Sequence, residues 1–224
     1  MEIKNLYVKF SDNIIYDSFN LSLDNDKITC MLGPSGVGKT TLLNAIAKSI
    51  KYQGDINGVG KIGYIFQEPR LIDALTVKQN LEFVMNEKDD KKIDEVLKDL
   101  DMYEYKDRYP ITLSGGQASR VSLARAIVSN PRYILMDEPF KDLDVVLTKS
   151  LIDLFRNLIE KNKIGALYIT HNVDEALSIA DRIIVLSSKP VQINLDIQIN
   201  SDHKNLASSE LNDAREKIYN ALHI

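Results

Sequence analysis

Apolar positions along the chain follow two different periods, and each period predicts a different kind of element. Continuous apolar runs are typical of parallel strands covered on both faces, and such strand-like runs occupy residues 28–32, 61–66, 133–136, 166–170 and 183–186. Apolar residues at helical spacing predict helices over 41–50 and over 147–159, the second ending before Gly165. This alternation of strands and helices predicts an α/β fold with a mostly parallel sheet.

Two segments depart from that alternation. Residues 68–112 carry two amphipathic helical patterns, around 77–84 and 93–100, without a convincing strand between them, so we expect a helical subdomain inserted into the α/β core. Residues 191–199 alternate apolar and polar side chains, which is the period of a half-buried strand. A polar loop over 200–204 then precedes a last amphipathic helix from about Leu211 to Leu222. We therefore expect one domain over 1–224, with a short C-terminal strand and helix over 189–224.

Composition and charge narrow the class of protein. The 224 residues are 44% hydrophobic and 27% charged, as in soluble globular domains. The net charge of −4 argues against a general nucleic-acid or anionic-membrane binder. Cys30 is the single cysteine, so an intrachain disulfide is excluded and a buried apolar role in its strand is expected. Without a secretory signal or an apolar run of roughly 18 residues, the sequence predicts a soluble, cytoplasmic protein whose membrane role would come through a partner.

A phosphate-binding loop is predicted between the first parallel strand and its helix. The pattern G-x-x-x-x-G-K-[ST] is matched by a run made of Gly33, Pro34, Ser35, Gly36, Val37, Gly38, Lys39 and Thr40. Its glycines let backbone amides wrap an oxyanion at the start of a helix, while Lys39 supplies a cation and Thr40 a hydroxyl ligand for Mg²⁺. The residue types and their context predict nucleotide binding.

Two adjacent carboxylates follow another apolar strand. Asp137 and Glu138 end the run that starts at Tyr133, and paired acids at a strand end are by themselves more often a solvated turn. Together with the upstream loop they match a Walker B arrangement, in which Asp137 holds Mg²⁺ through water and Glu138 faces the attacking water. The two motifs together predict Mg²⁺-dependent nucleotide hydrolysis.

A second potential anion site follows Leu113, which lies 20 residues before that strand. It consists of Ser114, Gly115, Gly116 and Gln117 at the start of a helical pattern, which offers an N-cap hydroxyl and exposed backbone amides. A Ser-Gly-Gly turn without context is usually a loop. Its place between the two nucleotide motifs gives one chain two phosphate-binding helix ends.

At this point the sequence, over roughly residues 1–190, resembles the nucleotide-binding subunit of an ATP-binding cassette (ABC) transporter. Gln67 resembles that family's glutamine loop, Asp144 its D-loop aspartate and His171 its switch histidine. The resemblance implies the ABC ATPase fold, a P-loop NTPase core with an antiparallel β part and an inserted helical subdomain.

It also implies a head-to-tail dimer, of two identical copies or of this chain with a similar cassette. ATP held by Lys39, Thr40 and Thr41 of one copy would be closed over by the other copy's signature residues 114–117, with Asp144 at the seam. Phe10 lies where the family stacks an aromatic ring on adenine, although an aromatic in an N-terminal strand is as often a core residue.

The resemblance assigns catalysis and metal binding to few residues. The implied catalytic set is Lys39, Gln67, Glu138 and His171, with His171 contacting the γ-phosphate. The implied Mg²⁺ ligands are Thr40, Gln67 and Asp137. A structural histidine is the usual reading of a lone His after a strand, but the surrounding Thr-His-Asn-x-Asp-Glu-Ala frame favours the switch role.

Segments 68–77, 173–176, 180–183 and 189–190 are similar to the family's nitrate, sulfonate and taurine importer branch. That similarity implies that an integral membrane permease is the direct partner and that a solute-binding protein is an indirect one. It also implies a location on the inner face of the cell membrane, and no nucleic-acid partner is expected. The solute stays open within the branch. One departure concerns Lys141 and Asp142, which replace the small residues usual before the D-loop leucine and place two charges near the predicted dimer seam.

Two alternatives from other classes stay open. A soluble ABC ATPase acting on ribosomes or DNA usually has two fused cassettes or a long insertion, and 224 residues with one P-loop fit neither. A non-hydrolysing adaptor, in which nucleotide only scaffolds a complex, is disfavoured by the presence of Glu138 and Gln67.

Overall fold

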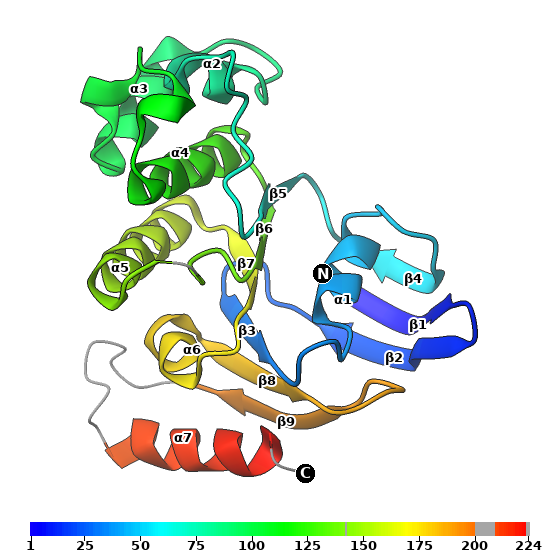
Figure 1. The fold of residues 1–224 in the computed structure, drawn as a ribbon. Helices are drawn as coiled ribbons and strands as arrows, with labels where there is room; N and C mark the ends of the chain where they lie inside the picture. Colours follow the sequence, from blue (N-terminus) through cyan, green and yellow to red (C-terminus); the bar gives the residue numbers. More distant parts are fainter. Residues whose placement is uncertain (142, 200–208, 223–224) are drawn as a thin grey trace.

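The computed structural model describes residues 1–141, 143–199 and 209–222. Within them the strands form two sheets (Figure 1). The antiparallel sheet has the order β2-β1-β4 and contains β1 (Glu2–Phe10), β2 (Asn13–Ser22) and β4 (Gln53–Asn57). The larger sheet has the order β5-β6-β7-β3-β8-β9 and contains β3 (Ile28–Leu32), β5 (Ile62–Ile65), β6 (Tyr133–Asp137), β7 (Gly165–Ile169), β8 (Arg182–Leu186) and β9 (Ile193–Gln198).

The larger sheet is parallel except at one edge. β5, β6, β7, β3 and β8 pair in parallel, and β9 pairs antiparallel with β8. This confirms the predicted α/β fold, and each continuous apolar run became a strand to within one or two residues. β9 has the predicted half-buried alternation, because it covers the sheet edge with one face towards solvent. The predicted polar loop over 200–204 lies outside the described residues.

The helices cover both faces of the larger sheet. Figure 1 shows α4 (Gly115–Val128), α5 (Val145–Asn162), α6 (Val173–Ile179) and α7 (Ser209–Leu222) on one side, with α1 (Lys39–Ile46) and the antiparallel sheet on the other. The helix expected over 41–50 is α1, which begins two residues earlier and ends four residues earlier than expected. No helix in the described ranges combines the length and apolarity that a membrane span requires.

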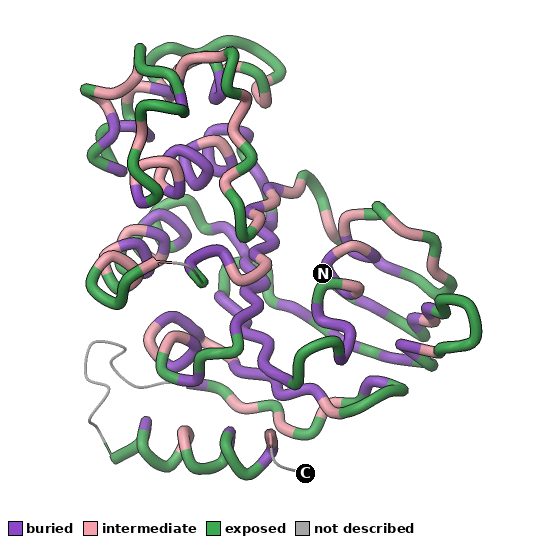
Figure 2. Tube along the Cα trace, viewed as in Figure 1, coloured by how far each residue is buried: buried purple, intermediate pink, exposed green. Residues whose placement is uncertain are grey.

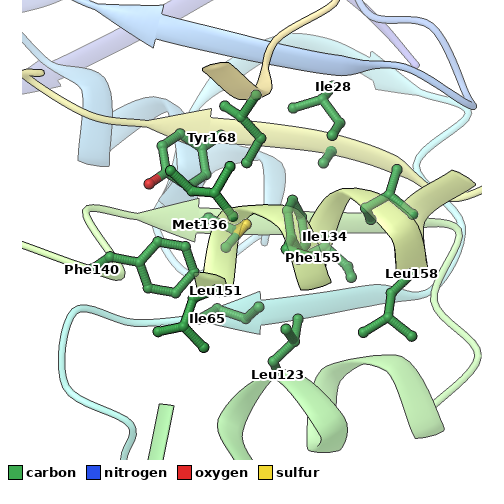
Figure 3. Packing of buried hydrophobic residues seen from close by; sticks show 14 of the residues in the cluster. Ile28, Ile65, Leu123, Ile134, Met136, Phe140, Leu151, Phe155, Leu158 and Tyr168 are labelled. Carbon is green, nitrogen blue, oxygen red and sulfur yellow. The ribbon is translucent and has the colours of Figure 1, made fainter. Parts of the chain in front are cut away.

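Residues on the parallel strands alternate between the two cores. From β6, Ile134 and Met136 pack towards α5, as Figure 3 shows, whereas Tyr133 and Leu135 belong to the cluster beneath α1. Cys30 is fully buried on the α5 side, as expected for a small apolar residue. Figure 2 shows this burial running along the central strands. Each fully buried large aliphatic side chain contributes about 1.5–3 kcal/mol, so the sheet is the rigid base for its loops.

Two helices over residues 77–99 pack on α4. These are α2 (Val77–Glu82) and α3 (Asp90–Asp99), followed by the short 3₁₀ turns η1 (Tyr103–Tyr105) and η2 (Pro110–Thr112). Their buried residues Val77, Leu81 and Ile93 join the same core cluster as α4 and the sheet. The described part of 68–112 contains no strand, in agreement with the helical pattern.

The strand order brings separate segments to one edge of the sheet. β3 is followed by residues 33–38, β6 ends at Asp137, and β7 ends two residues before His171. Because these three strands are parallel neighbours, their carboxyl ends meet at the same edge. Ligands of open parallel sheets bind at this edge.

Candidate active site

The loop between β3 and α1 wraps backbone around the start of a helix. Gly38 has φ 133, and a Cβ there would lie 2.7 Å from Ile15 on β2, so both conformation and space require glycine. Tyr16 donates a hydrogen bond from its hydroxyl to the Gly38 carbonyl at 3.0 Å and holds the loop against β2. The start of α1 has no side-chain cap within the described residues, which leaves its amides for an anion.

Lys39 at the start of α1 carries its charge into partly buried surroundings. Its Nζ donates to the carbonyl oxygens of Gly33 at 2.7 Å and Pro34 at 3.1 Å. Burial lowers the pKa of Lys39, and the nearby carboxylates of Glu138 and Asp137 oppose that shift. An anionic ligand would offset the same desolvation cost.

Asp137 and Glu138 point from the end of β6 towards the loop. Burial raises the pKa of Asp137, while a hydrogen bond from Thr40 and the charge of Lys39 act in the opposite direction and Glu138 reinforces the rise. Glu138 has φ 47, and its amide donates to the Ile169 carbonyl at 3.0 Å. That bond ties the turn after β6 to the end of β7.

His171 lies beside Glu138. Its Nδ1 is 3.3 Å from Oε2 of Glu138, and its side chain is 57% exposed. The segment before it is fixed by Glu175 on α6, whose carboxylate accepts hydrogen bonds from the hydroxyls of Tyr168 and Thr170. Asn172 caps α6 by accepting from the amides of residues 174 and 175.

A cavity of about 460 Å³ joins these parts. Its lining comes from α1, from the loop after β5 and from the end of β6; it consists of Thr40, Phe66, Gln67, Glu68, Arg70, Asp137, Glu138 and Lys141. Arg70 lies 3.9 Å above the Phe66 ring, which fixes the loop that carries Gln67. The structure therefore brings Thr40, Gln67, Asp137 and Glu138 together, with His171 in contact through Glu138.

The signature residues lie elsewhere. Ser114 caps α4 by accepting from the Gln117 amide at 3.3 Å, and Gln117 accepts from the Ser114 amide at 2.9 Å. Ser114 and Gly115 are exposed, and Asp144, also exposed, caps α5. None of the residues 114–117 or Asp144 lines the cavity described above. Within one chain these groups therefore lie apart from the cavity, with Ser114, Gly115 and Asp144 exposed and Gly116 buried.

Phe10 ends β1 opposite Asn13. It is 48% exposed, so it is not a core aromatic residue. The hairpin that it begins also carries Ile15 and Tyr16, which contact Gly38. Its ring is thus on the β unit that borders the loop, and adenine stacking stays a prediction.

Three groups near this site were not assigned roles from sequence. Tyr16 and Glu175 carry no local signal for their contacts, although Glu175 stands in the frame around His171. Lys141 attracted notice only as a departure from the family pattern, and its Nζ lies 3.2 Å from Glu138. The Tyr16 contact joins distant residues, whereas the contacts of Glu175 and Lys141 lie within single short segments.

The fold and the site together define a nucleotide-binding P-loop protein, and the comparisons specify its family. Residues 16–141, more than half of the chain, match the family model described as ABC transporter. The chain therefore belongs to the ABC transporter family, and it is an ATP-binding, ATP-hydrolysing subunit of that family.

Relatives with high similarity are import subunits. The chain is 37% identical over 193 residues to the aliphatic sulfonates import ATP-binding protein SsuB 1 of Pseudomonas savastanoi pv. phaseolicola, covering 85% of this chain and 81% of that protein. It is 38% identical over 210 residues to the Fe(3+) ions import ATP-binding protein FbpC of Fusobacterium nucleatum, covering 86% and 57% respectively. The alternative of a ribosome- or DNA-acting cassette gains no support from them.

Solved structures of ABC transporter cassettes have a similar fold. A dimeric structure of a bacterial ABC transporter cassette has a TM-score of 0.75 and 27% identity, and covers 89% of this chain and 99% of that one. A post-hydrolysis state of the same cassette, bound to ADP and Pi, has a TM-score of 0.74 with the same identity and coverage.

Proposed function

We propose that this chain powers the import of organic sulfonates by hydrolysing ATP at the carboxyl edge of its parallel sheet. The observation that carries the chemical part is the single cavity that gathers Thr40, Gln67, Asp137 and Glu138 beside the phosphate-binding loop. The solute class is supported by the relatives, several of which are named as aliphatic sulfonate import proteins.

Groups in and beside the cavity have separate chemical tasks in this proposal. Lys39 and the amides at the start of α1 bind the phosphates, and Glu138 accepts a proton from the attacking water. His171 contacts Glu138 and contributes a polar group next to the γ-phosphate. Gln67, on the loop after β5, orients the water.

The donor set at the cavity fits Mg²⁺. Thr40, Gln67 and Asp137 offer only oxygen ligands from the side chain, and the described residues hold no cluster of three His, Cys, Asp or Glu that would bind a metal unaided. Mg²⁺ is typically held by one or two carboxylates together with substrate phosphates. When bound, it neutralises charge on the phosphates during hydrolysis.

The helix start at residues 114–117 is completed by a second cassette in this proposal. Exposed Ser114 and Gly115 present a helix N-terminus that lies apart from the chain's own cavity, while Gly116 is buried. A helix start of this kind binds anions. We assign it to the ATP held by the partner copy, so that two nucleotides are enclosed between two chains.

Coupling to a membrane permease is assigned to the loop after Gln67. Arg125 on α4 donates to the carbonyl oxygens of Pro69 at 2.9 Å and Arg70 at 2.8 Å. The loop and the helical layer of α2, α3 and α4 are therefore tied together, and a change at Gln67 reaches that layer. The chain would lie on the cytoplasmic face of the membrane through this permease, with a solute-binding protein delivering the sulfonate.

Replacement of Glu138 tests the hydrolytic part. In Glu138→Gln we expect ATP binding to persist while turnover falls at least about 100-fold, because the proton acceptor is lost. An ATP-bound dimer should then accumulate, measured by size-exclusion chromatography with light scattering. Exposed Glu95 on α3 supplies the control, since Glu95→Gln should leave turnover unchanged. Normal turnover in Glu138→Gln would remove Glu138 from the mechanism.

Affinity capture and growth assays test the transport part. A tagged chain isolated from its native cells in mild detergent should bring down a multi-span membrane protein, whereas recovery of only ribosomal or DNA-bound material would contradict transport. Cells without the gene should fail to grow on an alkanesulfonate as sole sulfur source and should grow on sulfate. Loss of sulfate or iron uptake instead would show that the solute class is wrong.

A further inference from the structure

A lysine on the turn after β6 contacts the carboxylate to which we assign water activation. Nζ of Lys141 lies 3.2 Å from Oε2 of Glu138, and Nδ1 of His171 lies 3.3 Å from the same oxygen. One carboxylate oxygen is thus shared by two nitrogen groups. The Glu138 side chain is 21% exposed and the Lys141 side chain 45%, so the carboxylate is the more buried partner of this pair.

Local structure explains why the lysine lies there. The amide of Lys141 donates to the Glu138 carbonyl at 3.3 Å, which closes a turn. Between them Phe140 is buried and packs against Tyr168, with ring centroids 6.2 Å apart. With Phe140 anchored in the core (Figure 3), the side chain of Lys141 is left exposed and lines the cavity.

An ammonium on this oxygen has a chemical consequence. An ammonium 3.2 Å from this oxygen attracts the carboxylate and takes up space beside it that the attacking water would otherwise occupy. We propose that Lys141 is a positioning residue that keeps Glu138 from the attacking water in the single cassette, so that ATP turnover requires the Lys141–Glu138 pair to break. This inference rests on the role of Glu138 in the proposed function.

The position of Lys141 connects it to a surface that a second cassette would touch. Lys141 also borders a separate groove of about 460 Å³ between α5 and α6. Four residues further on, Val145 and Val146 at the start of α5 are 85% and 81% exposed. A second chain packed on these apolar residues would reach the turn and could release Glu138, which would link hydrolysis to dimer closure.

Steady-state ATP hydrolysis by the purified full chain tests the inference. Lys141→Met keeps the length of the side chain and removes the charge, and we expect kcat to rise about fivefold with KM for ATP unchanged. That increase corresponds to about 1 kcal/mol of barrier at ~1.36 kcal/mol per factor of ten. Lys141→Arg restores the charge and should stay within about twofold of the parent.

Two further variants keep the result interpretable. Lys217→Met removes another exposed lysine, on α7, which lines neither groove, and should not change kcat. Adding Lys141→Met to Glu138→Gln should leave the residual rate unchanged, because the effect requires the carboxylate. A rise in that background, or in Lys217→Met, would overturn the assignment.

The direction of the change in kcat decides the proposal. An unchanged kcat in Lys141→Met would overturn it, and a lower kcat would do so too, by showing that the ammonium assists the chemistry. If the parent itself has no turnover at any enzyme concentration and Lys141→Met has none either, the proposed function fails. Turnover in the parent without an increase in Lys141→Met contradicts only the inference about Lys141.

Discussion

Burial acts in opposite directions on the two charged groups at the centre of the site. It lowers the pKa of Lys39 and raises the pKa of Asp137, and in each case the neighbouring group of opposite charge offsets part of the shift. Both charges are therefore costly for the nucleotide-free fold. Bound phosphate and a divalent cation would repay that cost, which favours ligand binding at this place.

Asp137→Asn tests the effect of the Asp137 charge on stability separately from its effect on the binding of Mg²⁺ and ATP. Without nucleotide we expect the melting temperature to rise by about 1–2 °C, or about 0.5 kcal/mol after allowance for solvent screening, because an uncharged amide replaces a partly buried carboxylate. The additional stabilisation by Mg²⁺ and ATP should be lost. Differential scanning calorimetry with and without Mg²⁺-ATP measures both, and exposed Asp153→Asn is the control. A lower melting temperature without nucleotide would contradict this account.

At the scale of elements, α2 and α4 begin with the same N-terminal capping box. Thr76 and Gln79 form a capping box at the start of α2, and Ser114 and Gln117 form one at the start of α4. In both, the hydroxyl accepts from a backbone amide and the glutamine side chain accepts from the amide of the cap residue. The two caps are structurally equivalent, but only the second belongs to the proposed ATP contact.

This equivalence gives a matched pair of variants. Thr76→Ala and Ser114→Ala should each lower the free energy of unfolding by about 1 kcal/mol, or about 2–4 °C in melting temperature. Only Ser114→Ala should also reduce ATP turnover, by at least about fivefold, since its hydroxyl would face the partner's nucleotide. Thermal melts and phosphate-release assays on both variants measure this. Equal turnover in the two would show that Ser114 acts only as a helix cap.

At the scale of the whole molecule, one tyrosine connects the two sheets. Tyr133 on β6 donates from its hydroxyl to the Leu23 carbonyl at 2.8 Å, in the connection between β2 and β3. Gly165 on β7 leaves room for its ring, since a Cβ there would lie 2.5 Å from it. Burial raises the pKa of Tyr133 to about 12. The antiparallel sheet is thus fastened to the core by a buried polar contact.

Tyr133→Phe tests this connection. We expect the free energy of unfolding, from urea titration, to fall by about 1 kcal/mol through loss of the hydrogen bond. Because the unfolded phenol ionises near its usual pKa of 10.0, the folded chain binds more protons between pH 10 and about 12, and wild-type stability falls with rising pH in that window. The variant should lose less stability there. Exposed Tyr219→Phe is the control, and an equal loss in both variants would contradict the role of Tyr133.

Much of the fold could be predicted because short stretches of sequence determine these strands and this loop. The apolar runs at 28–32 and 133–136 have few alternatives to buried strands, and the loop over 33–40 is defined by its own glycines and lysine. The sequence pattern does not delimit the strands of the antiparallel sheet, because β1 and β2 mix exposed polar residues with irregular pairing, and Asn5, Ser11 and Ser18 have positive φ. The short helix α6 depends on its Asn172 cap and on packing, and seven residues give too little periodicity to detect.

The sequence by itself determined which chemical groups this protein has: a phosphate-binding loop, two carboxylates, a signature turn and a histidine, each placed next to an element of recognisable period. Only the tertiary structure decided which groups touch. The parallel order of β6, β7 and β3 brings Glu138 to His171, and the buried Phe140 leaves Lys141 beside the same carboxylate. The physical reason is that local sequence fixes backbone conformation, whereas contacts between distant residues depend on how the sheet is ordered and packed.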